Sequence, residues 1–261
     1  MPFRMSVLSA LGTLLCLLMY GPGVEGQERF QIATIKPSEP NTARHTQIQG
    51  TKFATTGTTL EDLLKFAYNV HASQIIGGPG WLRTEQFDIL ADPEMERRPS
   101  LDELKAMTAD LLGDRFHLVL VHERSELPVF ALRKGTGPLK LKPPSADPTS
   151  ILSGGLVPPG NLYVHGGTVK DFIAYLERFA PRELDRPIVN QTEIQGRFEF
   201  ELHYTPDSLR SEEQRPASTS PTSLPPDIFT AIQEQLGLKL TAVKAEVEVL
   251  HIASVTPPTP N

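Results

Sequence analysis

Acidic and aromatic side chains alternate in residues 198–204, and this alternation could support acid–base chemistry. Glu199, Glu201 and His203 fall on one face of a predicted strand, and the other face carries Phe198, Phe200, Leu202 and Tyr204. Two carboxylates and a histidine in a row could transfer protons or hold a cation. The same alternation is typical of a sheet with one buried and one solvated face, and we favour that interpretation.

The seven histidines give no recognisable metal-binding pattern. His117 and His122 lie five residues apart, so on one strand their side chains would point to opposite faces and could not share a metal without a bulge. The sequence contains no His-Glu-x-x-His phrase. We therefore expect neither a metal nor a cofactor.

The usual signatures of a serine nucleophile or a phosphate loop do not occur in the sequence. It has neither Gly-x-Ser-x-Gly nor Ser-x-x-Lys. The glycine-rich phrase at residues 77–80 lacks the Gly-Lys-Ser/Thr ending, and Pro79 removes an amide donor. We interpret this phrase as a rigid turn that positions the only tryptophan, Trp81.

Trp81 and Tyr68 are the aromatic residues that could form a binding platform. An exposed Trp81 would offer a sugar or a peptide a flat apolar surface, with Tyr68 on a nearby helix. A buried Trp81 would instead anchor the core, and we favour the core. Both residues stay candidates for ligand binding, together with the Glu199, Glu201 and His203 row.

The first residues predict export. Arg4 precedes an apolar run from Val7 to Tyr20, and small residues follow as far as Gly26. This pattern is typical of a secretory signal peptide at 1–26, cleaved near Gly26. The run is too short for a permanent span, so we expect no membrane span in the mature chain, and localisation that is secreted or periplasmic. The only cysteine, Cys16, lies inside the run, which excludes disulfides from the mature chain.

The composition limits the class of partner. The formal net charge is −6, and the basic residues are scattered along the chain rather than clustered. Nucleic acid is therefore not an expected partner. After cleavage, about 235 residues would remain, which is enough for one large or two small domains.

A pattern in residues 50–132 returns in the same order in residues 160–252, and it predicts the fold. Each segment has a capped helix, a Phe-centred strand, a second helix ending in Leu-Gly, and a Glu-plus-apolar strand. The helix signals are Thr59-x-x-Asp62, Ser100-x-x-Glu103, Thr168-x-x-Asp171 and the apolar run at 228–236. Gly113 is expected to end the second helix, and strands are expected at 118–121 and 124–132. The class is α+β, with two similar β-α-β-α-β-β units, each a small sheet packed under two helices.

Proline, glycine and serine mark the expected boundaries. The first unit covers 27–142, and a Pro/Gly/Ser-rich linker covers 143–160. The second unit covers 161–256 and contains an insertion at 210–227, and 257–261 is a Pro-rich tail.

Several phrases together resemble a family of secreted, soil-associated bacterial proteins defined as a domain of unknown function. The resemblance covers most of the mature chain and is carried by Phe30-x-x-Ala33-x-Ile35-Lys36-Pro37-Ser38, Gly77-Gly78-Pro79-x-Trp81, Leu111-Leu112-x-Asp114-Arg115-Phe116-x-Leu118, Ala231-x-Gln233-Glu234-Gln235-Leu236-Gly237-Leu238-Lys239-Leu240 and Pro258-Thr259-Pro260-Asn261. It implies export, an α+β domain and, in some members, fusion to a membrane metallopeptidase domain of the antibiotic-sensor type. It supplies no catalytic residues. This chain has Asn190 and Glu193 where the family more commonly has Asp and Gly.

The sequence thus favours a non-enzymatic binding or sensory module whose partner is an envelope protein or an extracellular ligand. The sites expected to bind are sheet edges and a cleft between the units. The alternative is an extracytoplasmic hydrolase that uses carboxylates such as Glu199 or Glu201. A third possibility, a structural accessory to an envelope complex, would need an exposed apolar patch.

Overall fold

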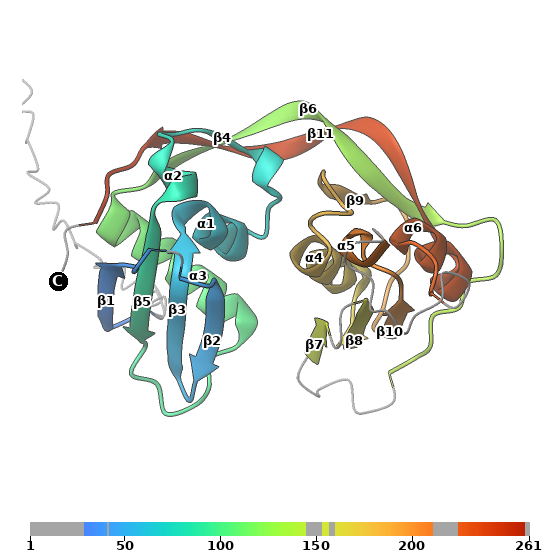
Figure 1. Ribbon diagram of the computed structural model, residues 1–261, viewed down its shortest axis with the longest axis horizontal. Coiled ribbons are helices and arrows are strands. Elements are labelled where there is room, and N and C mark those ends of the chain that lie inside the picture. Colours follow the sequence, from blue (N-terminus) through green and yellow to red (C-terminus); the bar gives the residue numbers. More distant parts are fainter. Residues whose placement is uncertain (1–28, 41, 145–152, 157–159, 211–223, 259–261) are drawn as a thin grey trace, which may run out of the picture.

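The chain folds into two α+β lobes that hang side by side from a long two-stranded ribbon (Figure 1). The computed structural model describes residues 29–40, 42–144, 153–156, 160–210 and 224–258. Helices and several small sheets occur in both lobes, so the predicted α+β class is confirmed.

The first lobe is an antiparallel four-stranded sheet covered by helices. The strand order is β1 (Ile32–Pro37), β5 (Gln86–Asp92), β3 (Lys52–Thr59), β2 (His45–Gln49). The helices are α1 (Leu60–Tyr68), the short α2 (Trp81–Thr84) and α3 (Leu101–Phe116). Alternate sheet residues such as Phe53 and Ile89 pack against helix residues such as Leu63 and Met107, and together they form one buried core.

The predicted helix starts are confirmed in both lobes. Thr59 and Ser100 cap α1 and α3, and Thr168 caps α4 (Val169–Phe179) in the second lobe. In each capping box the cap hydroxyl accepts a hydrogen bond from the third helical amide, and the acidic side chain at that position bonds back to the cap amide. These bonds satisfy amides that have no partner within the helix.

The predicted end of α3 at Gly113 is wrong, because the helix continues to Phe116. Phe116 is fully buried in the first-lobe core, so burial of the last turn outweighs the low helix propensity of glycine. The helix ends at His117, whose φ of 49° is left-handed, and the Leu118 amide donates to the Leu112 carbonyl.

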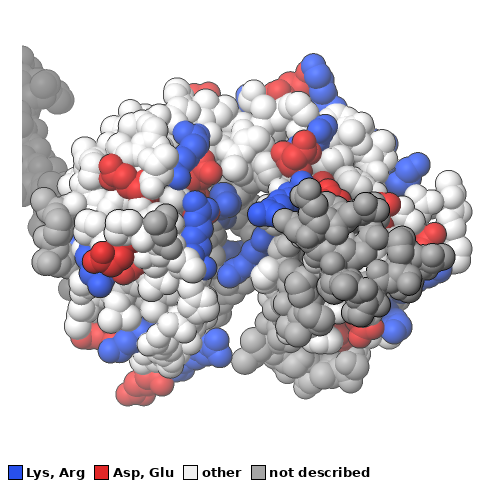
Figure 2. All heavy atoms as spheres, in the orientation of Figure 1, with Lys and Arg blue, Asp and Glu red and all other residues white. Residues whose placement is uncertain are grey.

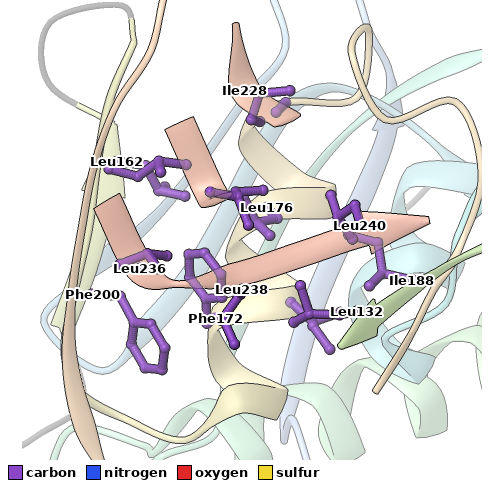
Figure 3. Packing of buried hydrophobic residues seen from close by; sticks show 14 of the residues in the cluster. Leu132, Leu162, Phe172, Leu176, Ile188, Phe200, Ile228, Leu236, Leu238 and Leu240 are labelled. Carbon is purple, nitrogen blue, oxygen red and sulfur yellow. The ribbon is translucent and has the colours of Figure 1, made fainter. Parts of the chain in front are cut away.

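The second lobe is a three-stranded sheet covered by helical segments. The strand order is β10 (Phe198–His203), β8 (Asn161–Gly167), β7 (Ser153–Leu156). Helix α4 covers the sheet together with α6 (Ile228–Ala231), which continues into the π-helical turn η4 (Ile232–Leu236); α5 (Asp207–Arg210) follows β10. Figure 3 shows how these elements meet in the core. Phe172 of α4 stacks on Phe200 of β10, with ring centroids 4.6 Å apart.

The ribbon consists of β6 (Val119–Lys134) and β11 (Leu238–Ser254), which pair antiparallel along almost their full length. The expected separate strands at 118–121 and 124–132 are therefore one strand. No turn interrupts the pairing, so the polar residues between the two apolar stretches stay in the ladder. At the centre Glu126 lies opposite Glu246, and the cations Lys244 and Arg124 each lie 3.6 Å from one of these carboxylates.

In each half of the chain a short strand pairs with the long ribbon strand of the other half. Residues 52–134 run β3, α1, η1, β4, α2, β5, α3, β6, and residues 161–254 run β8, α4, β9, β10, α5, α6, η4, β11. The short strand β4 (Ile75–Gly77), after the 3-10 turn η1 (Ala72–Gln74), pairs parallel with β11 of the other half. In the same way β9 (Ile188–Asn190) pairs parallel with β6. The sequence did not predict this exchange, which ties both lobes to one ribbon.

Some expectations fall outside the described residues. The predicted signal peptide lies there, as do most of the linker at 143–160 and of the insertion at 210–227. The described part of the linker includes β7, which pairs with β8. Among the residues that the structure describes, no helix is long and apolar enough to cross a membrane.

Candidate functional site

The acidic row predicted from the sequence lies on β10, and each of its members has its own neighbour. Phe200 and Leu202 are fully buried on the other face of the strand, so the predicted alternation is present. The polar contacts are Glu199 Oε2 to His165 Nδ1 at 2.6 Å, Glu201 Oε2 to Lys142 Nζ at 3.9 Å, and His203 Nδ1 to Asn161 Oδ1 at 2.6 Å. The three groups pair with separate neighbours instead of converging on one point. This arrangement is what a solvated sheet face produces.

The outer edge of β10 is covered by a side chain from the Gln-Glu-Gln-Leu-Gly phrase. Gln235 accepts a hydrogen bond from the His203 amide at 2.8 Å and donates to the His203 carbonyl at 2.6 Å. Its amide group therefore occupies the place of a further strand at the end of β10. A sheet edge satisfied in this way is less available for pairing with another chain.

Trp81 and Tyr68 lie in the first lobe, on the other side of the molecule from the acidic row. Both are half-buried against the first-lobe core. The ring of Tyr68 also meets that of His122 edge-on, with centroids 6.2 Å apart. The five candidate residues thus form two separate groups rather than one site.

The glycine-rich phrase before Trp81 forms a tight turn. Gly77 and Gly78 have left-handed φ values of 78° and 75°, and α2 begins directly after the turn at Trp81. A Cβ on Gly78 would come within 2.3 Å of the Leu82 side chain. Glycine is needed there because the backbone crosses the core surface at close range.

The two neighbouring histidines are not on one strand, contrary to the sequence analysis. His117 ends α3, and its Nδ1 lies 3.1 Å from Thr256 Oγ1. His122 is on β6, with Nδ1 2.5 Å from Glu248 Oε1. The difference arises because α3 is longer than expected and takes His117 into its C-terminal cap.

A cleft of about 200 Å³ lies between the lobes, beneath the middle of the ribbon. The sequence predicted a cleft between the units but not which residues line it. The first lobe contributes Asn69 and Gln74, the second lobe contributes Lys170, Glu177 and Asn190, and the ribbon contributes the apolar Val247. Lys170, Ile173 and Glu177 are spaced i, i+3, i+7 on α4, so one stripe of this helix faces the cleft.

Glu177 is the most perturbed carboxyl group of the cleft. Burial raises its pKa to about 7, and the hydrogen bond that it accepts from the Ile188 amide at 2.7 Å opposes this shift. Its charge therefore changes near neutral pH. A carboxyl group of this kind can hold or release a proton under physiological conditions.

His71 links the two lobes at the edge of the same region. Its Nδ1 accepts a hydrogen bond from the Ser73 amide at 3.2 Å, which places the proton on Nε2 in the neutral ring. Burial and then Lys65 lower the pKa of His71, while a hydrogen bond with the backbone of Leu184 in the second lobe opposes them.

Three cations lie on the facing helices α3 and α4. Burial lowers the pKa of Lys105 on α3; Asp102 and Asp171 oppose this shift, while Lys170 and Arg178 on α4 add to it. Figure 2 shows Lys and Arg side chains on both sides of the hollow between the lobes. Of these three cations, Lys170 lines the cleft.

The family model described as "Protein of unknown function (DUF3738)" matches residues 61–255. The chain belongs to this family. The match spans both lobes and the ribbon, so the DUF3738 domain includes all the residues that line the cleft. No curated protein and no solved structure matches the chain.

Asn190 and Glu193 lie at the turn after β9 of this DUF3738 chain. Asn190 Oδ1 accepts hydrogen bonds from the Thr192 amide at 3.0 Å and from its hydroxyl at 2.8 Å, and an aspartate could accept both. Glu193 has a left-handed φ of 57°, a conformation in which glycine has no steric cost. An aspartate at position 190 and a glycine at position 193 would therefore also fit this turn.

The sequence analysis missed Lys105, Lys170 and Glu177. The signal for Lys170 and Glu177 was present, because they share one stripe of a securely predicted helix. Lys105 comes from the other half of the chain and reaches the same region only through the packing of the lobes. Single-sequence periodicity identifies a face of a helix but not what that face meets.

Proposed function

We propose that this protein is a non-enzymatic binding module that acts outside the cytoplasm and takes its ligand between the two lobes, beneath the ribbon. The observation that carries the proposal is the cleft itself, since its lining combines residues of both lobes with one from the ribbon. Ligand sites are typically concave and mix apolar surface with a few placed polar groups. The charged and apolar pattern of residues 4–26 supports the location.

The ribbon gives the cleft an apolar roof. Along its inner face Leu127, Ala245 and Val247 are half-buried between the lobes, and Val247 lines the cleft. A ligand that covers Val247 would gain roughly 25 cal/mol for each Å² of apolar surface removed from water. The amide group of Asn69 and the Nδ2 of Asn190, whose Oδ1 already accepts from Thr192, can then fix its orientation.

A thermal-shift and calorimetry screen tests this proposal. The purified chain is exposed to a panel of organic acids, phosphates, neutral sugars and short peptides. Val247→Trp should fill the roof of the cleft and abolish binding of any hit. Val121→Trp is the matched control, because Val121 is on the same ribbon and 43% exposed, and it should leave binding intact. A ligand that binds Val247→Trp as tightly as it binds the wild-type chain would refute a site in the cleft.

A hydrolase is the second candidate, and the Glu199–His165 contact favours it. The Glu199 carboxylate is only 10% exposed and lies 2.6 Å from the His165 ring, as a general base and its partner would. Turnover of a polysaccharide and peptide panel that Glu199→Gln abolishes would establish this activity. Turnover that Glu199→Gln leaves unchanged, or none at all, would reject it.

A further inference from the structure

We infer that the ligand of the cleft is a short extended peptide that pairs with the free edge of β9, with its carboxylate end at Lys170 and its amino end at Glu177. This inference rests on the proposed function, since it names the class of ligand for the same site. The main chain of β9, the two opposite charges on α4 and the size of the cleft support it.

Strand β9 is an edge strand that borders the cleft. The strand order of its sheet is β4, β11, β6, β9, so β9 has a neighbouring strand on one side only. All three residues of β9 and the proline before it line the cleft: Pro187, Ile188, Val189 and Asn190. The cleft is therefore bounded by the main chain of an edge strand and not by side chains alone.

Two hydrogen bonds to β6 fix which main-chain groups of β9 face the cleft. The Pro187 carbonyl accepts a hydrogen bond from the Phe130 amide at 2.8 Å, and the Gln191 amide donates to the Leu132 carbonyl at 2.9 Å. Main-chain groups of successive strand residues point to opposite sides of the strand. The odd-numbered residues of this segment thus face β6, and the even-numbered ones face away from it.

Ile188 and Asn190 are the residues whose main chain faces away from β6. Glu177 Oε1 accepts a hydrogen bond from the Ile188 amide at 2.7 Å, and the Asn190 side chain bonds to Thr192. Within the described parts of the chain, the Ile188 carbonyl and the main-chain amide and carbonyl of Asn190 have no partner on this side. An extended peptide about 4.8 Å from β9 would supply the missing donors and acceptor, as in other cases of strand addition to a sheet edge.

Opposite charges lie at the two ends of the α4 stripe that faces the cleft. Lys170 and Glu177 are seven residues apart, or about 10 Å along the helix axis, a spacing beyond the reach of an ordinary ion pair. Three residues in extended conformation also span about 10 Å. A tripeptide with free ends can therefore place its carboxylate at Lys170 and its ammonium group at Glu177.

The rest of the cleft suits a ligand of this length. A volume of about 200 Å³ is below that of most sites for drug-sized molecules, which limits the peptide to a few residues. Ile173 and Val247 offer apolar contacts to its side chains, and the Asn69 amide group can bond to its main chain. Affinity should therefore depend on the main chain and the two ends of the peptide more than on its side chains.

Isothermal titration calorimetry with the tripeptide Ala-Val-Ala tests the charged ends. The free peptide is compared with its C-terminally amidated and N-acetylated forms, on the full chain, Lys170→Met, Glu177→Gln and the control Lys239→Met, since Lys239 is exposed on β11. Amidation should weaken binding to wild type about tenfold or more but should weaken binding to Lys170→Met no further. Acetylation should show the same relation to Glu177→Gln. Lys239→Met should change the affinity less than about twofold.

N-methylation of the peptide tests the pairing with β9 without any change to the protein. The two main-chain amides of an extended tripeptide point to opposite sides, so only one of them can face β9. A methyl group on that nitrogen removes the donor and blocks the approach of the strand, which should weaken binding about tenfold. A methyl group on the other nitrogen should weaken it less than about twofold.

Four results would overturn the inference in whole or in part. Amidation that weakens binding to wild type and to Lys170→Met equally would contradict the assignment of the carboxylate end. Equal effects of the two N-methylations would contradict the pairing with β9. A sugar, phosphate or organic acid whose binding Val247→Trp abolishes, while no peptide binds, would refute the peptide class and leave the proposed function standing. A panel without any hit would reject both.

Discussion

Glu177 makes the stability of this protein depend on pH, and Glu177→Gln isolates the effect. The folded-state pKa of about 7 lies above the ordinary value of 4.5 that applies to the unfolded chain. Between these two values the native state keeps a proton that the unfolded state has lost. The contribution of Glu177 to the free energy of unfolding should therefore be highest below pH 4.5, fall as the pH rises through this window, and level off above 7.

The size of the effect follows from the same two pKa values. A pKa difference of 7 minus 4.5, at 1.36 kcal/mol for each unit, gives about 3 kcal/mol. The amide side chain introduced by Glu177→Gln would still accept the hydrogen bond from the Ile188 amide but would never ionise. The variant should match wild type near pH 4.5 and exceed its free energy of unfolding by up to about 3 kcal/mol at pH 8.

Urea denaturation at pH 5, 6, 7 and 8, monitored by circular dichroism, measures this difference directly. Glu201→Gln is the control, since it removes an exposed carboxylate from β10. A difference between wild type and Glu177→Gln that stays constant from pH 5 to 8 would refute the argument from burial.

Three further substitutions test the backbone and the sheet edge. Glu193→Gly should raise the free energy of unfolding by up to about 1 kcal/mol in urea denaturation, because φ is 57°, while Gln195→Gly should give no gain. Gly78→Ala should lower the free energy of unfolding by about 2 kcal/mol, because the left-handed φ strains an alanine and the added Cβ overlaps the core. Gly80→Ala should be tolerated, because no atom lies within 4 Å of a Cβ added there. A similar loss in both variants would contradict the turn geometry. Gln235→Leu should lower the free energy of unfolding by about 1 to 2 kcal/mol and speed amide hydrogen exchange at the end of β10, because both hydrogen bonds with His203 are lost. Unchanged exchange there would show that this side chain does not protect the edge.

Local signals predicted the elements of the fold well. The capping boxes at Thr59, Ser100 and Thr168 each begin a helix, and the alternation at residues 198–204 gives a strand with Phe200 and Leu202 buried. Such signals depend on neighbours in the chain, so one sequence is enough to read them.

Long-range pairing was not predicted. The pairing of β6 with β11 joins residues more than 100 positions apart, and no local pattern marks it. The same limit applies to the cleft, where Asn69 and Lys170 come from different halves. At Gly113 the low helix propensity of glycine predicted a helix end, but burial of Phe116 keeps the last turn helical.

A crystal structure of the chain with a ligand from the thermal-shift and calorimetry screen bound is the most direct test of the account. We predict ligand density between the lobes, beneath Val247 and in contact with Lys170 or Asn190. A ligand bound anywhere else, or an empty cleft at a saturating concentration, would contradict the claim that this protein binds its ligand between the lobes.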